Sequence, residues 1–305
     1  MNSLIIGGTG FIGKYLVEEL LASGRKVITV SRHNFEYNKV EHHLVETLFD
    51  KKIEKILNSG IDEVVYLAYA TKPKTSFDNP VRDIEENLAQ TVHLFESVYK
   101  IKSIKRIIYV SSGGTVYGNS NSNAISENHA QNPISPYGIT KLTIEHFAKM
   151  FFKIYDLPVI IVRPSNAYGI GQAAKEGQGF IAYAMHSILH DKPINIYGEQ
   201  GTIRDYIYVS DVAKAIRFSL DKAQCGNTYN IGSGTGYSNS EIINLIDKVI
   251  GKKYTVKLEY SDSRPFDVNK NILDTAAIKK DTGWVPLISI QEGLLLTWNA
   301  LTKQP

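Results

Sequence analysis

The N-terminal stretch up to Gly24 constrains the fold more than any other part of the chain. Residues 2–6 (Asn-Ser-Leu-Ile-Ile) form a short apolar run, which is typical of a buried parallel strand. This run leads into a glycine-rich turn at residues 7–13 and then into an amphipathic stretch at residues 14–22. A strand, a glycine turn and a helix in this order predict a dinucleotide-binding turn, with the pyrophosphate on the helix N-terminus.

The glycines of this turn have the spacing GxxGxxG, not the more familiar GxGxxG. The physical roles are the same: a tight turn, close approach of the backbone to the pyrophosphate, and close packing of helix on strand. We expect the turn to contact the cofactor through Gly7, Gly10, Phe11, Ile12 and Gly13.

The end of the next strand bears on the choice of cofactor. This strand, at residues 26–30, is followed by Ser31 and Arg32, so the acid expected to bind the ribose 2′-hydroxyl of NAD is missing at these positions. An arginine there suits the 2′-phosphate of NADP, which it can bind with two hydrogen bonds. The sequence therefore favours NADP, with NAD as the alternative. Ala68, directly after a third strand at residues 63–67, is also expected at the cofactor.

Strands and helical patterns alternate from the N-terminus to Gly169. Further strands are expected at residues 106–110 and 159–162, and helices at residues 81–99 and 136–155. This alternation predicts an α/β fold with a doubly wound parallel sheet of the Rossmann type over residues 1–169. Residues 170–305 are expected to form a smaller α/β substrate lobe, with some segments returning to the first domain.

One helical turn in the first domain carries a candidate for proton transfer. Tyr137 and Lys141 are four residues apart, so they lie on the same helix face. A phenol has a pKa near 10, and a nearby cation lowers this value by favouring the phenolate. A polar, glycine-rich loop at residues 111–118 follows the strand at 106–110, at the sheet edge where ligands of α/β proteins bind. The pair and the loop together predict an active site.

Composition excludes several classes of partner. The net charge is +3, with 34 Lys and Arg against 31 Asp and Glu, too balanced to indicate binding to nucleic acid or to a membrane surface. The chain has no apolar run of the roughly 20 residues that a membrane span needs. Cys225 is the only cysteine, so an intrachain disulfide is excluded and a reducing compartment fits. We expect a cytoplasmic protein with a small-molecule substrate and no metal site.

The motifs together resemble those of the extended short-chain dehydrogenase/reductase family. Within it, the chain looks most like the nucleotide-sugar epimerases, dehydratases and 4-ketoreductases. The resemblance rests on the glycine turn, the loop at 111–118 and the Tyr137–Lys141 pair, and it continues through residues 163–166, 204–211, 264–267 and 283–286. It therefore covers essentially the whole chain.

The resemblance implies roles for individual residues. Tyr137 would act as acid and base on the sugar C4 oxygen, and Lys141 would bind the nicotinamide ribose and lower the pKa of the tyrosine. Arg204 and Arg264 would bind the diphosphate of a nucleotide sugar through their planar guanidinium groups. Asn166 would contact the substrate near its phosphates or its sugar. In relatives, helices matching residues 81–99 and 136–155 pair across a two-fold axis, so a homodimer is also implied.

The chain departs from the family pattern in two places. The position at which relatives carry the hydroxyl partner of the tyrosine falls on Gly113, which leaves Ser112, Thr115 or a water molecule to supply that hydroxyl. Tyr208 stands where relatives often carry histidine, and we expect only a structural effect from this change.

Two reactions at sugar C4 fit this pattern. The missing acid at Ser31 and Arg32 favours a 4-ketoreductase that reduces an NDP-4-keto-6-deoxyhexose with NADPH, in the synthesis of polysaccharide precursors. The alternative is a 4-epimerase of a UDP-hexose, either UDP-glucose or UDP-N-acetylglucosamine, which recycles a tightly held NAD. Family dehydratases carry Asp-Glu in the upstream loop, and Gly113-Gly114-Thr115 has neither. A dinucleotide sensor without catalysis is the third hypothesis, because a fold does not dictate a function.

Overall fold

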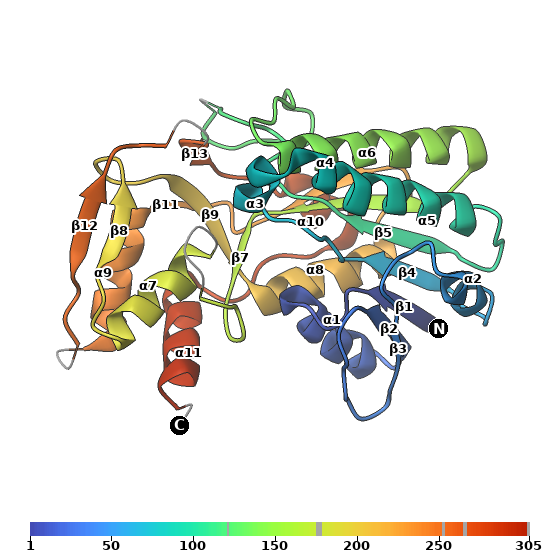
Figure 1. The fold of residues 1–305 in the computed structure, drawn as a ribbon, viewed down its shortest axis with the longest axis horizontal. Helices are drawn as coiled ribbons and strands as arrows, with labels where there is room; N and C mark the ends of the chain where they lie inside the picture. The colour runs from blue at the N-terminus through green and yellow to red at the C-terminus, as the bar shows by residue number, and fades with distance from the viewer. Residues whose placement is uncertain (121, 175–178, 252–253, 265–266, 304–305) are drawn as a thin grey trace.

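The computed structural model describes residues 1–120, 122–174, 179–251, 254–264 and 267–303. Pro265 and Phe266, which belong to the motif that begins at Arg264, lie outside these ranges. A central sheet with helices on both faces dominates the described part of the chain (Figure 1). Its strands run in the order β10 (Thr228–Ile231), β6 (Val159–Pro164), β5 (Arg106–Val110), β4 (Glu63–Tyr66), β1 (Asn2–Ile6), β2 (Lys26–Ser31) and β3 (Val40–Leu44).

All neighbouring strands of this sheet are parallel, which confirms the predicted doubly wound sheet. The strand order reverses between β1 and β4, and open α/β sheets bind their ligands in the crevice at such a point. Alternate residues of β1 enter different cores: Leu4 and Ile6 pack on one side of the sheet and Ile5 on the other. Because both faces of the sheet are buried at β1, the sequence of this strand is a nearly continuous apolar run.

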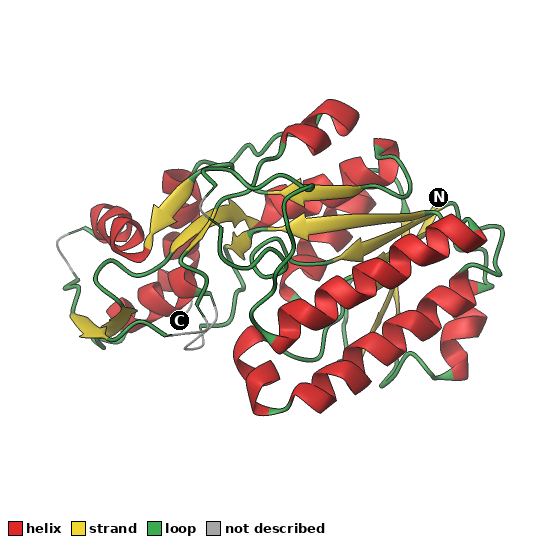
Figure 2. Cartoon of the chain, turned by 90° about the horizontal axis from the view of Figure 1, so that it is seen from above, coloured by secondary structure: helices red, strands yellow, loops and turns green. Residues whose placement is uncertain are grey.

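Each face of the sheet is covered by a separate layer of helices. One layer contains α2 (Lys51–Leu57), α5 (Gln90–Val98) and α6 (Pro136–Tyr155). The other contains α1 (Phe11–Ala22), α8 (Val209–Lys222) and α10 (Ala276–Thr282). In the first layer, α5 and α6 lie side by side (Figure 2).

The strands predicted around the site agree with β1, β2, β4, β5 and β6, but β3 and α2 were not predicted. β3 lies at one edge of the sheet and pairs only with β2 among the described strands. Its sequence, Val-Glu-His-His-Leu, is mostly polar because most of its side chains remain partly or fully exposed. An edge strand of this kind lacks the apolar run by which the buried strands were recognised.

The helix predicted at residues 81–99 is divided into three pieces. They are α4 (Pro80–Asp83), a π-helical turn η1 (Ile84–Ala89) and α5. The buried Asn87 lies in η1, where its Oδ1 accepts a hydrogen bond of 2.7 Å from Ala70 N and its Nδ2 donates one of 2.9 Å to Asp83 O. Asn87 thereby fixes the segment that follows β4. π-turns inside helices occur often at functional sites.

The smaller lobe lies beyond the carboxyl ends of the central strands (Figure 1). Its described strands form one sheet of β7 (Asn166–Tyr168), β9 (Ile203–Tyr208), β11 (Gly236–Ser238) and β13 (Lys270–Asn271), and a parallel pair of β8 (Ile194–Tyr197) and β12 (Leu258–Ser261). The helices α7 (Phe180–Leu189), α9 (Asn239–Ile250) and α11 (Ile290–Thr302) pack around a core of their own.

Parts of the second half of the chain belong to the first domain. β10 extends the central sheet beside β6, and α8 packs against α1. The lobe is therefore interrupted in sequence by segments that pack on the central sheet and its helices. None of the helices in the described ranges combines the length and the apolar character that a bilayer crossing requires.

Candidate active site

Two adjoining cavities lie along the carboxyl edge of the central sheet. The larger, of about 700 Å³, separates the sheet from the smaller lobe, and the smaller, of about 270 Å³, lies at the ends of β2 and β4. The structure brings all the predicted site residues to these cavities. The larger is lined by Gly7, Gly10, Phe11, Ile12, Gly13, Ser112, Thr115, Tyr137, Lys141, Asn166, Arg204 and Arg264. The smaller is lined by Gly7, Gly10, Ser31, Arg32 and Ala68.

The glycine turn has no room for side chains. Gly7 has a φ of +94°, and a Cβ atom on it would lie 2.7 Å from Ala68 N. A Cβ atom on Gly13 would lie 2.3 Å from Gly7 O, so α1 approaches the turn too closely for alanine. Helix α1 has no acid in its first turn, and no described side chain caps its N-terminus. Its first N–H groups are therefore available to an anion, and the turn fits a dinucleotide pyrophosphate.

Charges of both signs line the smaller cavity. The Arg32 side chain is 47% exposed, and its Nη1 lies 4.0 Å from Glu86 Oε2. Ser31 Oγ donates a hydrogen bond of 2.7 Å to His33 O. Glu86 comes from η1, so a carboxylate reaches this cavity although neither Ser31 nor Arg32 is acidic. The cavity thus combines the arginine expected for a 2′-phosphate with an acid from a segment distant in sequence.

Helix α6 starts at the wall of the larger cavity. Ser135 Oγ accepts a hydrogen bond of 3.1 Å from Gly138 N and caps the helix, and Pro136 occupies its first position. A Cβ atom on Gly138 would lie 2.9 Å from Thr115 O, so the first turn packs tightly against the loop after β5. The packing places Tyr137 and, one turn later, Lys141 at the cavity.

Lys141 is a buried cation, with 3% of its surface exposed. Its Nζ donates a hydrogen bond of 2.8 Å to Val110 O and lies 3.9 Å from the centre of the Tyr69 ring. Burial lowers the pKa of this amine to about 7, while the negative charges of Glu145 and Asp83 act in the opposite direction. Lys141 therefore titrates near neutral pH.

The pKa of Tyr137 differs from the expectation. Burial raises the pKa of its phenol above the ordinary value of 10, and the charge of Asp83 adds to this rise, whereas a hydrogen bond with Ser112 opposes it. The predicted lowering by Lys141 is wrong for this structure, because the lysine Nζ is 5.7 Å from the Tyr137 ring centre and is hydrogen-bonded to Val110 O. Tyr137 is therefore protonated at neutral pH and can donate a proton.

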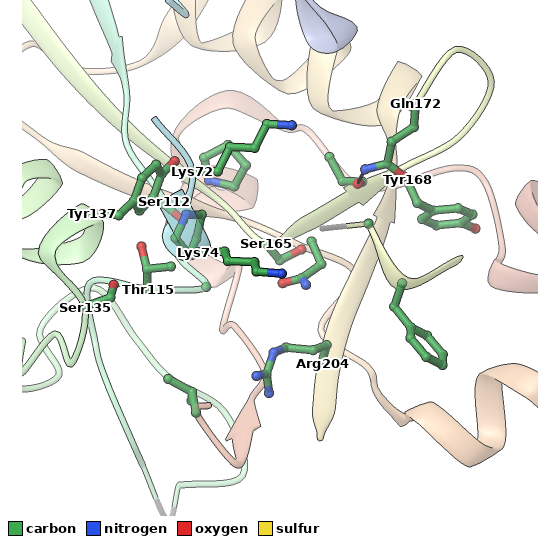
Figure 3. A pocket seen from close by; sticks show the side chains of 18 of the residues that line it. Lys72, Lys74, Ser112, Thr115, Ser135, Tyr137, Ser165, Tyr168, Gln172 and Arg204 are labelled. Carbon is green, nitrogen blue, oxygen red and sulfur yellow. Dashed lines mark hydrogen bonds between the residues drawn. The ribbon is translucent and has the colours of Figure 1, made fainter. Parts of the chain in front are cut away.

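The structure explains why glycine occupies position 113. A Cβ atom on Gly113 would lie 2.5 Å from Leu273 Cδ1 and 2.9 Å from Arg163 O, which leaves no room for a hydroxyl side chain. Of the two predicted substitutes, Ser112 lies close enough to the Tyr137 phenol for its hydroxyl to oppose the rise in that pKa. Thr115 lies on the same side of the cavity as Tyr137 (Figure 3), and its buried Oγ1 has no hydrogen-bond partner among the described residues. Ser112 is thus the better placed hydroxyl.

The smaller lobe supplies the opposite side of the cavity. Arg204, from β9, lies across the cavity from Tyr137 (Figure 3), and its Nη1 donates a hydrogen bond of 3.0 Å to Ile203 O. Burial lowers the pKa of this guanidinium. The next residue, Asp205, is fully buried and accepts hydrogen bonds from Ser233 N at 2.8 Å and Leu273 N at 3.2 Å. These bonds fix β9 and hence the position of Arg204.

Arg264 and Asn166 complete this side. Arg264 Nε donates a hydrogen bond of 2.8 Å to Asp267 Oδ2, and the guanidinium lies 4.1 Å from the centre of the Tyr197 ring. Asn166 follows β6, and its Oδ1 would lie 3.1 Å from a Cβ atom on Gly114. The planar guanidinium is therefore held by an ion pair and a ring contact.

Comparison with known proteins identifies the family. The model of the NAD dependent epimerase/dehydratase family matches residues 3–232. The chain belongs to this family. It is 31% identical to dTDP-4-dehydro-6-deoxyglucose reductase of Escherichia coli, over 95% of this chain and 94% of that protein. It is 29% identical to UDP-glucose 4-epimerase of Mycolicibacterium smegmatis, over 97% of each. The crystal structure of UDP-glucose 4-epimerase with UDP-glucose from Thermotoga maritima superposes with a TM-score of 0.92, at 30% identity and 99% coverage of both chains.

This member of the epimerase/dehydratase family has further cavity residues that the sequence did not single out. Lys72 and Lys74, at the start of α3 (Pro73–Asp78), extend into the larger cavity (Figure 3), and Tyr69 and Ser165 also line it. Lys72, Lys74 and Tyr69 come soon after β4, so their place at a carboxyl strand end was the available signal.

The larger cavity of this family member is positively charged. Among its described lining residues are the cationic side chains of Lys72, Lys74, Lys141, Arg204 and Arg264. Asp267 is the acidic residue among them, and it pairs with Arg264. Within the described ranges, no group of three or more His, Cys, Asp or Glu residues could hold a metal ion. The five cationic side chains suit a ligand with several negative charges.

Proposed function

We propose that this chain is a nucleotide-sugar oxidoreductase that acts at sugar C4, and more specifically a 4-epimerase of UDP-glucose or UDP-N-acetylglucosamine. The observation that carries the proposal is the shared cavity: Tyr137, Lys141 and the glycine turn line the side formed by the sheet, and Arg204 and Arg264 line the side formed by the lobe. The first side suits a dinucleotide and a proton transfer, and the second suits a diphosphate.

The residues of the sheet side perform distinct tasks in this reaction. The bound dinucleotide supplies hydride exchange at the sugar C4 carbon. Tyr137 exchanges a proton with the C4 oxygen of the sugar: as the protonated phenol it gives the proton to the 4-keto oxygen, and it takes the proton back in the reverse step. Lys141, whose Nζ is 5.7 Å from the Tyr137 ring centre, would contact the nicotinamide ribose of the bound dinucleotide. Arg204 and Arg264 hold the diphosphate while the sugar reacts.

Epimerisation also requires that the 4-keto sugar rotate within the site, so that its other face receives the hydride. Gly114, in the loop beside Tyr137, lines the larger cavity, so no side chain projects from this position into the space next to the sugar. The likeness to UDP-glucose 4-epimerases of two organisms supports the same reaction.

Stoichiometry tests this proposal. The purified protein is incubated with UDP-glucose, UDP-N-acetylglucosamine and dTDP-4-keto-6-deoxyglucose, with and without added NADPH, and the sugars are separated by chromatography. We expect interconversion of a UDP-hexose and its C4 epimer without added cofactor and without net NADPH oxidation. Oxidation of one NADPH per ketosugar would instead identify a reductase. Binding of dinucleotide without turnover of any of these sugars would favour a sensor.

The 4-ketoreductase favoured by the sequence is the second candidate. Its support is the pair Ser31 and Arg32 at the smaller cavity and the likeness to the E. coli reductase. This candidate entails a preference for NADP over NAD. Calorimetry on protein stripped of cofactor should then show tighter binding of NADPH than of NADH, and Arg32→Ala should narrow the difference. Equal affinities in the unmodified protein would remove the support for this candidate.

We also propose that the protein forms a homodimer through the helices α4, η1, α5 and α6. Large apolar side chains are exposed on this layer, including Val81 (60%), Ile84 (50%) and Ile139 (53%). Two copies of such a face would bury them in a four-helix contact. Sedimentation should show a dimer at micromolar concentration, and Ile139→Asp should shift it toward monomer. A monomer in the unmodified protein would contradict the proposal.

A further inference from the structure

The Lys141 ammonium lies among three tyrosine rings. Its Nζ is 3.9 Å from the ring centre of Tyr69, 5.2 Å from that of Tyr109 and 5.7 Å from that of Tyr137. The rings come from three separate places: the segment after β4, the strand β5 and the helix α6. The Tyr69 ring is the nearest of the three, and at this distance its face attracts a cation.

The carboxylates that face Lys141 have other partners. Glu145, one turn further along α6, accepts a hydrogen bond of 2.9 Å from Arg163 Nε, and both side chains are fully buried. Asp83, at the end of α4, accepts hydrogen bonds from the hydroxyl of Thr71 and from Asn87 Nδ2. Neither carboxylate is therefore reserved for the lysine.

We propose that Tyr69 is a positioning residue, whose ring face holds the Lys141 ammonium in its charged form beside Tyr137. The same ring packs edge-on against the Tyr137 ring, with centres 4.8 Å apart, so one side chain fixes both members of the pair. A buried ammonium has lost its hydration, and the negative face of an aromatic ring replaces part of it. Because the pKa of Lys141 lies at about 7, a small change in this contact alters the charged fraction at neutral pH.

This inference rests on the proposed function only in that Lys141 serves the reaction. Two substitutions distinguish the effect of the Tyr69 ring on Lys141 from the effect of the Tyr69 hydroxyl. Tyr69→Phe keeps the aromatic face, and Tyr69→Leu removes it while keeping an apolar side chain. The titration of Lys141 is followed directly by NMR of protein with ¹³C-labelled lysine ε-carbons, and its signal is assigned by its loss in Lys141→Met. This measurement reports the protonation of Lys141 whether or not the protein converts a sugar.

We expect the titration midpoint of Lys141 to fall by about one pH unit in Tyr69→Leu and to change by much less in Tyr69→Phe. The high-pH limb of kcat should move down by the same amount in Tyr69→Leu, with the KM for the nucleotide sugar unchanged. Equal shifts in both variants, or no shift in Tyr69→Leu, would overturn the proposal. If circular dichroism shows that Tyr69→Leu is unfolded, Tyr69→Met takes its place. If the NMR shifts are as expected but the protein converts none of the sugars, the proposed function is contradicted and the role of Tyr69 is not.

Discussion

The two sides of the larger cavity are built in different ways. The sheet side consists of the glycine turn, the loop after β5 and the first turns of α6, each a short continuous segment. The lobe side places Arg204 on β9 and Arg264 near β13, and fixes them through Asp205, Asp267 and the Tyr197 ring. Backbone geometry sets the first side, and contacts between distant side chains set the second. Changes on the sheet side should therefore impair chemistry or folding, and changes on the lobe side should impair substrate binding.

The largest effect is expected from Tyr137→Phe on the sheet side. Removal of the phenolic hydroxyl deletes the group that moves the C4 proton, so kcat should fall by about 10²–10⁴-fold. The affinity for the nucleotide sugar, measured by calorimetry, should stay within a factor of a few because the lobe side is intact. A variant that retains most of its kcat would exclude Tyr137 as the proton donor and acceptor.

A methyl group at Gly13 should destabilise the fold. Its Cβ atom would lie 2.3 Å from the backbone oxygen of Gly7, so the turn and α1 must move apart, at a cost of about 1–3 kcal/mol. Urea unfolding should show this loss, together with weaker cofactor binding. Gly114→Ala is the matched control, because its Cβ atom would meet only the Asn166 side chain, at 3.1 Å, and that side chain can adjust. Equal stabilities of the two variants would contradict the close packing of the turn.

On the lobe side, Arg204→Met should raise the KM for the nucleotide sugar by roughly 10- to 100-fold, the effect of losing a hydrogen bond between charged groups. The kcat at saturating substrate should change little, because Tyr137 and Lys141 are untouched. Arg217→Met is the control: this arginine pairs with Glu19 and Asp221, and it is not among the lining residues of the cavity. A loss of kcat with constant KM would indicate that Arg204 acts in the chemical step and not in substrate binding.

The smallest effect concerns the pH dependence of stability. Burial lowers the pKa of Lys141 to about 7 in the folded protein, so between pH 7 and 10 the unfolded chain binds the extra proton. Stability from this group therefore rises with pH, by at most about 1.4 kcal/mol per pH unit. Chemical denaturation from pH 7 to 9 should show a rise in the wild type relative to Lys141→Met. Parallel pH profiles would indicate that Lys141 is not buried in its neutral form.

The same difference between the two sides governed what could be predicted from the sequence. The turn at Gly7–Gly13 and the pair Tyr137 and Lys141 were recognised because their geometry follows from local spacing. Arg204 and Arg264 were found only through a family resemblance. Lys72, Lys74 and Tyr69 follow the carboxyl end of β4, but they were missed because this position alone does not say which side chains reach the cavity; that depends on the packing of α3 and of the segment after β4.

The pKa shifts and the charge contacts of the site were the properties least predictable from the sequence. The sequence places Lys141 next to Tyr137, but the sign of the tyrosine pKa shift depends on burial and on Asp83, which lies in a distant helix. Glu86 is a similar case, because η1 brings its carboxylate to the Arg32 cavity. Both effects require knowledge of which helices cover which end of the sheet.

The place of β10 in the central sheet has a consequence during synthesis on the ribosome. β6 ends at Pro164, but the strand that pairs with its outer edge is Thr228–Ile231, so more than sixty residues must emerge before that edge is covered. Until then the nascent chain exposes the backbone N–H and C=O groups of an apolar strand, which are a template for association with other chains. While the residues between β6 and β10 are being synthesised, the outer edge of β6 therefore lacks its strand partner.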